Sequence, residues 1–138
     1  MKILCISDQI DPLVYSMNIK DRYKDVDLVI SAGDLPMEYL EFIVSALNKP
    51  LLFVFGNHNL GAMPYYHKNL KENASIQAFA DTTTEGYGST YVGFTTHREG
   101  KLLVAGVSGS IRYNSDVGQY TERQMYYRLL ALVPRLIY

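Results

Sequence analysis

The sequence has a single cysteine and no apolar run long enough to cross a membrane. One cysteine cannot form an internal disulfide bond, and the apolar neighbours of Cys5 predict a buried thiol in the core, which fits a reducing compartment. No apolar stretch approaches the ~20 residues that span a bilayer. No charged-then-apolar leader opens the chain either. These absences predict a cytoplasmic protein that does not bind a membrane.

The sequence also lacks an excess of charge of either sign. Its 138 residues include 13 Lys and Arg and 14 Asp and Glu, which gives a net charge of −1. This balance does not suggest a nucleic-acid partner, so a negatively charged substrate would have to be held by a local site or by bound cations. With 48% hydrophobic residues and no repeats or linkers, residues 1–138 are expected to form a single domain.

Three short apolar runs in the first half predict strands that are covered on both faces. They span residues 2–7, 26–32 and 50–55. A weaker helical pattern covers 13–24. A stronger helix is predicted between the second and third runs, where Pro36 suits a first helical turn and apolar residues recur at three- and four-residue steps: Met37, Leu40, Ile43, Val44 and Leu47. This alternation of strands and helices predicts parallel strands joined by right-handed crossovers.

The second half predicts a hairpin and then a helix. Two β-rich runs in residues 91–109 surround the turn-like residues 98–101. Thr121 and Gln124 have the spacing of a capping box, and the helix is expected to continue until Pro134 ends it.

The last ten residues are unusually apolar and cover more than one face of the expected helix. Chain ends are ordinarily polar, so an apolar end predicts a partner, either more chain or another subunit. The residues concerned are Leu129, Leu130, Leu132, Val133, Leu136, Ile137 and Tyr138.

Polar residues follow each of the three early strands. Asp8 follows the first, Asp34 the second, and Asn57 with His58 the third. Taken singly, each has an ordinary explanation as a helix cap, a turn residue or a surface histidine. Functional groups gather beyond the carboxyl ends of parallel strands, however, so the combination predicts a site if these strands are adjacent.

The residue types at this predicted site suit a metal-dependent reaction. Carboxylates bind hard divalent cations, and Mn²⁺ or Fe also accept amide or imidazole ligands. Asp34 is placed to bridge two metals, Asp8 to hold one and Asn57 the other. His58 could protonate or stabilise a leaving oxygen.

The stretches "SDQI", "SAGDLP" and "FGNHN" resemble the first three motifs of the calcineurin-like metallophosphoesterases, over about residues 1–60. The later "VAGVSGSIRYN" is also similar to a strand and loop of that family. The resemblance implies a layered α/β sandwich, with parallel N-terminal strands and a C-terminal hairpin plus helix. It further implies Mn²⁺, Fe or Zn as cofactors and hydrolysis of a phosphomonoester or phosphodiester by metal-bound hydroxide. The resemblance assigns Asp8 to the first metal, Asp34 to both and Asn57 to the second, with His58 as the catalytic imidazole oriented by Asp34.

The sequence departs from that family in three places. Ile10 stands where a metal-binding histidine is usual, with Asp11 as a possible replacement, and Asn59 stands where an acidic residue is usual. The later Gly-His-x-His is absent, and His67 and His97 are expected at the surface. These departures predict a truncated or split half of the domain, impaired on its own, that forms a homo-oligomer or binds a second chain supplying the rest.

Two other functions remain open from the sequence. The chain could be a catalytically inactive remnant or subunit that acts through its apolar C-terminal surface. It could also bind a nucleotide through "GVSGS" at 106–110. A turn at the end of the hairpin is favoured for that stretch, because a phosphate loop of the Walker type needs a following Gly-Lys-Ser/Thr.

Overall fold

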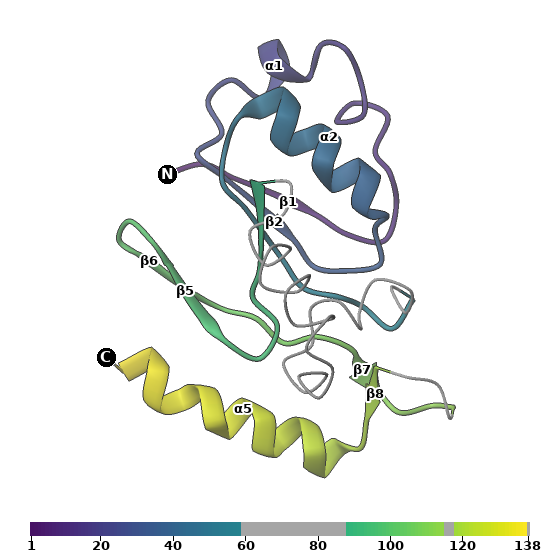
Figure 1. Ribbon diagram of the computed structural model, residues 1–138, viewed down its shortest axis with the longest axis vertical. Helices are drawn as coiled ribbons and strands as arrows, with labels where there is room; N and C mark the ends of the chain where they lie inside the picture. Colours follow the sequence, from purple (N-terminus) through teal and green to yellow (C-terminus); the bar gives the residue numbers. More distant parts are fainter. Residues whose placement is uncertain (59–87, 115–117, 138) are drawn as a thin grey trace, which may run out of the picture.

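A four-stranded parallel sheet forms the centre of the computed structural model, which describes residues 1–58, 88–114 and 118–137 (Figure 1). The strands lie in the order β1-β2-β3-β4. Neighbouring strands pair in parallel throughout, so the predicted parallel arrangement of the first three is confirmed. The bounds are Ile3–Ile6 for β1, Leu28–Ser31 for β2, Leu51–Phe53 for β3 and Ser89–Tyr91 for β4.

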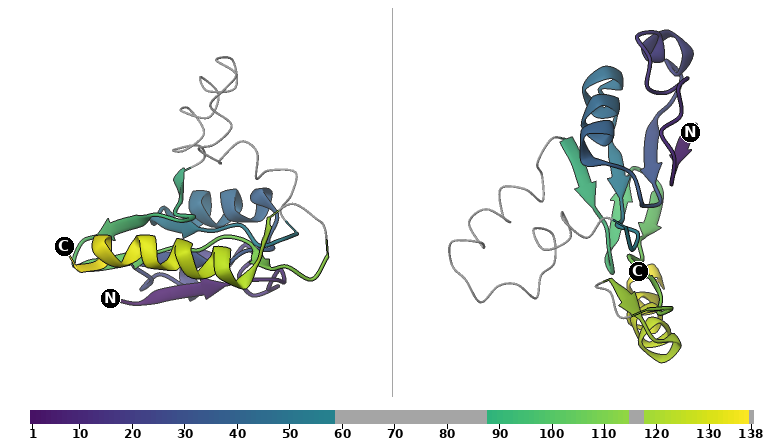
Figure 2. Two further views of the ribbon diagram at one scale, coloured as in Figure 1. Left: turned by 90° about the horizontal axis from the view of Figure 1, so that it is seen from below. Right: turned by 90° about the vertical axis from the view of Figure 1, so that its right-hand side faces the viewer.

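The helices α1 (Ile19–Arg22) and α2 (Met37–Leu47) pack with one face of this sheet (Figure 2). α2 has the predicted bounds, whereas α1 is much shorter than the 13–24 segment. α2 ends at Leu47 and is capped by Asn48, whose N–H still bonds the carbonyl of Val44 and whose left-handed backbone (φ 51°) turns the chain out of the helix. The core between helices and sheet includes Leu40 and Ile43 of α2 and Val29, Leu51 and Phe53 of the strands.

The opposite face of the sheet is partly covered by an antiparallel hairpin of β5 (Thr96–Glu99) and β6 (Leu102–Ala105). Gly100, at φ 58°, makes the predicted turn. The first predicted β-rich run is in fact divided, because its beginning belongs to β4 of the parallel sheet. A second core connects the two layers and contains Leu28, Leu52, Val92, Leu102 and Val104.

Strand β1 lies at the edge of the sheet, and this position explains one wrong prediction. Cys5 is exposed rather than buried. It pairs in register with Ile30, whose side chain packs into the second core, but the covering layer does not shield β1. Ile3, two residues earlier on the same face, is 40% exposed for the same reason.

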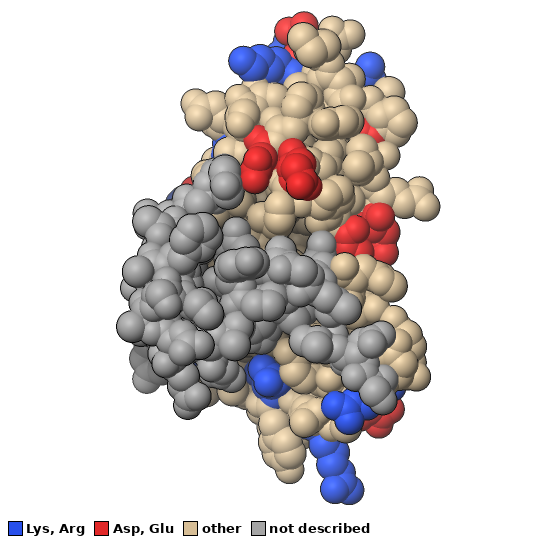
Figure 3. All heavy atoms as spheres, turned by 45° about the vertical axis from the view of Figure 1, so that its right-hand side comes forward, with Lys and Arg blue, Asp and Glu red and all other residues tan. Residues whose placement is uncertain are grey.

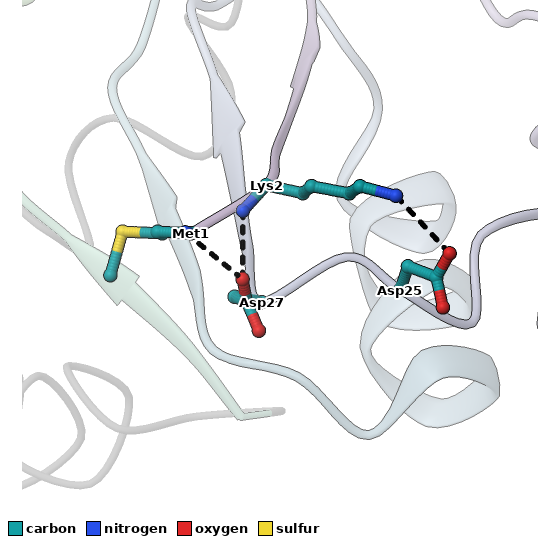
Figure 4. Close-up of polar contacts among 4 residues, drawn as sticks. All are labelled: Met1, Lys2, Asp25 and Asp27. Atoms are coloured by element: carbon teal, nitrogen blue, oxygen red, sulfur yellow. Dashed lines mark hydrogen bonds and ion pairs between the residues drawn. The ribbon is translucent and has the colours of Figure 1, made fainter.

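The N-terminal end of β1 is tied to the start of β2 by polar contacts (Figure 4). The Lys2 amide donates to the carboxylate of Asp27 at 2.7 Å, and the Asp27 amide donates to the Lys2 carbonyl at 2.8 Å. The Lys2 ammonium lies 3.1 Å from Asp25. Exposed ion pairs contribute little, so the backbone bonds matter most for register.

After β6 the chain forms a short parallel pair, β7 (Ser110–Ile111) and β8 (Gln119–Tyr120), and then α5 (Glu122–Ile137). The capping box is confirmed: Thr121 N–H bonds the Gln124 side chain at 2.9 Å, and Gln124 N–H bonds the Thr121 hydroxyl at 3.2 Å. The prediction that Pro134 ends the helix is wrong, because Pro134 lies inside α5. Proline lacks an N–H and its ring crowds the carbonyl four residues earlier, yet the described helix continues past it to Ile137.

Helix α5 lies across the end of the molecule opposite α1 and α2 and rests on the hairpin and β8 (Figure 1). The Arg128 guanidinium lies 4.4 Å from the ring centre of Phe94 and 4.3 Å from that of Tyr120, and Leu132 is buried. The outer side of α5 is apolar and exposed, as the sequence predicted. It consists of Tyr126, Leu129, Leu130, Val133, Leu136 and Ile137.

None of the helices in the described part of the chain is long and apolar enough to cross a membrane. On the face shown in Figure 3, Lys and Arg side chains lie in small groups toward the two ends, without a continuous basic surface among the described residues.

Candidate functional site

The loops after β1, β2 and β3 meet at one edge of the sheet because the strands end level with one another. Ile6 pairs with Ser31, and Ser31 with Phe53. The first two loops are joined by a hydrogen bond from the Asp8 amide to the Gly33 carbonyl at 3.2 Å. The expected convergence of Asp8, Asp34 and Asn57 at this edge therefore has a structural basis in the strand register.

Both aspartates at this edge have a left-handed backbone. Asp8 has φ 61° and Asp34 has φ 60°. This conformation is uncommon outside glycine, although aspartate tolerates it better than most residues. Residues held in sparsely populated backbone regions cluster at functional sites, where the surrounding structure maintains them. Aspartate also adopts this conformation in ordinary turns, so it adds weight only together with the contacts that the two residues make.

The carboxylate of Asp34 lies directly over the third loop. A Cβ added at Gly56 would stand 2.1 Å from Asp34 Oδ1, and a Cβ added at Gly33 would stand 2.6 Å from the Gly56 nitrogen. Both contacts are too short for any side chain, so glycine at 33 and at 56 permits the two loops to approach. Asp34 Oδ1 then accepts a hydrogen bond from the backbone N–H of His58 at 2.9 Å.

This bond shows how Asp34 and His58 are connected. The hydrogen bond between the two residues fixes the backbone of His58. The orientation of the imidazole by Asp34, which the resemblance implied, stays a prediction. The His58 side chain is exposed at the edge of the site.

Asn57 contacts a residue that the sequence did not reveal. Its side-chain amide nitrogen donates to the hydroxyl of Tyr113, with an N–O distance of 2.5 Å. Tyr113 follows β7 and lies 56 positions along the chain from Asn57. No spacing rule connects residues so far apart, and the only signal was that "IRYN" belongs to the later stretch similar to the same family.

The segment 106–110 is hydrogen-bonded to the residues that follow β3. The Phe55 amide donates to the hydroxyl of Ser108 at 3.2 Å, and the Gly109 amide donates to the Phe55 carbonyl at 2.8 Å. The Ser108 hydroxyl also lies 2.9 Å from the hydroxyl of Tyr91. Burial raises the pKa of Tyr91, and the hydrogen bond to Ser108 lowers that pKa by part of the rise. The segment leads into β7, as the favoured turn at the end of the hairpin predicts, whereas a phosphate loop of the Walker type leads into a helix.

The remaining candidates take other roles or lie elsewhere. Asp11 accepts the Leu13 amide at 2.7 Å, which makes it a turn residue rather than a ready replacement for a ligand at Ile10. His97, in β5, lies 3.6 Å from Glu99 of the hairpin and is one-third exposed. Asn59 and His67 lie outside the described residues.

The donor atoms at this edge suit an oxygen-preferring cation. Asp8 and Asp34 offer carboxylates, and Asn57 offers an amide oxygen because its nitrogen is used by Tyr113. Among residues 1–58, 88–114 and 118–137, no three His, Cys, Asp or Glu side chains form a group that could hold a metal ion. A cation bound at this edge would therefore depend on the amide and on further ligands from water, substrate or another chain.

Comparison with known proteins assigns the chain to no family. No protein-family model, curated protein or solved structure matches it. The functional argument therefore depends on the geometry at this edge and on the three motifs.

Proposed function

We propose that this chain carries the metal-dependent centre of a calcineurin-like phosphoesterase, formed by Asp8, Asp34, Asn57 and His58. One observation supports the proposal above the others: the strand-end loops are linked in series. Asp8 bonds Gly33, Asp34 bonds His58, and the last link runs from Asn57 to Tyr113. The first link is a backbone bond that continues the β1–β2 pairing, whereas the other two use the side chains of Asp34 and Asn57, so the proposal is supported mainly by these two.

Each residue of the proposed centre has a distinct task. Asp8 and Asp34 supply negative charge and oxygen ligands, and Asn57 supplies a neutral oxygen ligand. A bound Mn²⁺, Fe or Zn ion would polarise the phosphoester and promote attack by water. The exposed imidazole of His58 can donate a proton to the leaving oxygen, and Asp34 fixes the position of the His58 backbone.

The fold we propose is part of the layered α/β sandwich of that family. The parallel sheet has helices on one face and the β5–β6 hairpin on the other, which is the order of layers such a sandwich requires. We also propose that a second chain or second copy supplies the further metal ligands.

The first test is hydrolysis of an activated phosphodiester, bis(p-nitrophenyl) phosphate, by purified protein with added Mn²⁺. We expect weak activity, which Asp34→Ala and His58→Ala abolish. Asp34→Asn serves as the matched variant, because an amide oxygen can still accept the His58 N–H while the charge is lost. It should fold normally and be inactive; unchanged activity in both alanine variants would refute the site assignment.

The alternative is a non-enzymatic subunit that acts through the exposed apolar side of α5. The exposure of Tyr126 (59%) and Ile137 (76%) at the two ends of that side favours it, since a contiguous exposed apolar patch marks an interaction surface. The metal content of the purified protein distinguishes the two. A bound transition metal that Asp34→Asn removes supports the enzyme, and its absence after incubation with Mn²⁺ supports the subunit.

A further inference from the structure

The hydroxyl of Tyr113 stands at the end of a supported loop. Tyr113 itself is 65% exposed, so packing does not explain its position. The loop between β7 and β8 is instead organised by Gln119, which is only 5% exposed. The side-chain oxygen of Gln119 accepts the Tyr113 amide at 3.0 Å and the Asn114 amide at 3.1 Å.

The same side chain completes its bonding within the loop. Its amide nitrogen donates to the side-chain oxygen of Asn114. Burying a polar amide is unfavourable unless its hydrogen bonds are satisfied, and here these are satisfied by the residues that place Tyr113. A buried glutamine is thus used to hold an exposed tyrosine in one place.

The residues just before β7 are bonded to the segment that carries Asn57. Ser108 and Gly109 bond both backbone groups of Phe55, two residues before Asn57. Asn57 and Tyr113 therefore extend from segments that are bonded to each other, and the 2.5 Å contact joins their ends.

The hydrogen bond from the Asn57 amide nitrogen fixes the plane of that amide and leaves its oxygen as the end not bonded to Tyr113. An amide binds a cation only through its oxygen. A cation bound to that oxygen needs an acceptor for the N–H₂ group at the other end, and the Tyr113 hydroxyl is that acceptor. Groups that orient a metal ligand in this way commonly change metal affinity ten-fold or more when removed.

We propose, on the basis of the function proposed above, that Tyr113 is a positioning residue that holds the Asn57 amide oxygen toward a divalent cation. Gln119 supports it by fixing the loop. The test uses the full chain and Mn²⁺ as the probe, with affinity measured by calorimetry or by electron paramagnetic resonance of free Mn²⁺.

Tyr113→Phe removes only the hydroxyl of an exposed ring, so the midpoint of thermal unfolding should not change. We expect Mn²⁺ affinity to fall on the order of ten-fold. Tyr127→Phe is the matched control, because Tyr127 is similarly exposed (67%) and lies outside the apolar outer side of α5; it should bind as the wild type does. An unchanged affinity for Tyr113→Phe would overturn the inference.

A rescue variant separates positioning from general damage. Asn57→Asp replaces the amide by a group with two oxygens, for which orientation no longer matters. In that background a cation can use either oxygen, so Tyr113→Phe should lower Mn²⁺ affinity less than it does in the wild type. A ten-fold loss there as well would show that Tyr113 acts by another route and would overturn the inference.

A metal-free measurement distinguishes failure of this inference from failure of the proposed function. The ¹H and ¹⁵N resonances of the Asn57 side-chain amide should shift in Tyr113→Phe without any metal. If they do not, the hydrogen bond is absent and the inference alone fails. If they shift but the wild type binds no Mn²⁺, the proposed function fails, and the metal-positioning role fails with it.

Discussion

Asp34 shows at the scale of single residues why the candidate site requires particular neighbours. Its carboxylate accepts the His58 N–H and lies where any side chain at position 56 would have to be. Gly33 precedes it with φ 107° and meets Gly56 closely. The two glycines of "AGD" and "FGN" therefore serve one purpose, which is to let the ends of β2 and β3 approach with Asp34 between them.

Replacing Gly56 by alanine tests this arrangement. The added methyl must displace the Asp34 carboxylate, so we expect a loss of about 1–3 kcal/mol in the free energy of unfolding and loss of Mn²⁺ binding. Chemical denaturation and a Mn²⁺ titration measure the two effects. Gly100→Ala is the control: it also introduces a side chain at a glycine, but nothing lies within 4 Å of its Cβ. That variant should lose about 1 kcal/mol through its positive φ and retain metal binding.

At the scale of elements, the sequence predicted what is encoded locally. The spacing of Leu40 and Ile43 identified α2, and Thr121 with Gln124 identified the start of α5. Buried runs identified β1, β2 and β3. Pairings between distant segments were not predicted: β4 joins β3 across residues 54–88, and β7 pairs with β8 through only two residues each. Elements so short carry no periodic signal, and their position is decided by contacts such as Ser108 with Phe55.

The Ser108 contact gives a prediction at this scale. Ser108→Ala leaves the buried Phe55 N–H without its acceptor, so we expect about 1–3 kcal/mol lower stability. Ser110→Ala is a matched control two residues along, because its buried hydroxyl has no hydrogen-bond partner in the described structure. Its removal should change stability by less than about 0.5 kcal/mol. Equal losses in the two variants, measured by urea denaturation, would contradict the role given to Ser108.

At the scale of the whole molecule, apolar surface is covered to different degrees on the two faces of the sheet and on the outer side of α5. One face of the sheet is well covered, whereas Ile3 and Cys5 on the other are exposed. The outer side of α5 is a continuous apolar stripe from Tyr126 to Ile137, since its exposed residues recur at three- and four-residue steps. Of the site, the sequence predicted the three strand-end motifs but not Tyr113, because that contact exists only in the assembled fold.

The stripe on α5 should cause the protein to associate. We expect sedimentation velocity at high micromolar concentration to show species larger than a monomer. Val133→Glu, in the middle of the stripe, should shift the protein toward monomer because it places a charge on that surface. Arg135→Gln, an exposed change away from the stripe, should leave association unchanged. A wild-type protein that sediments as a monomer throughout would contradict the prediction.

The hydrogen bonds between β3 and the β7 segment have a consequence for the order in which the molecule forms. They join residues 53 and 56 positions apart, so closing that long loop opposes them entropically until the sheet has assembled. During synthesis the three motifs leave the ribosome long before Ser108 and Tyr113 do. A nascent chain that has emerged as far as residue 60 thus contains the three motifs by which the site is recognised, yet lacks the contacts with Ser108 and Tyr113. The candidate site is therefore expected to form late in folding, after β3 and the β7 segment have come together.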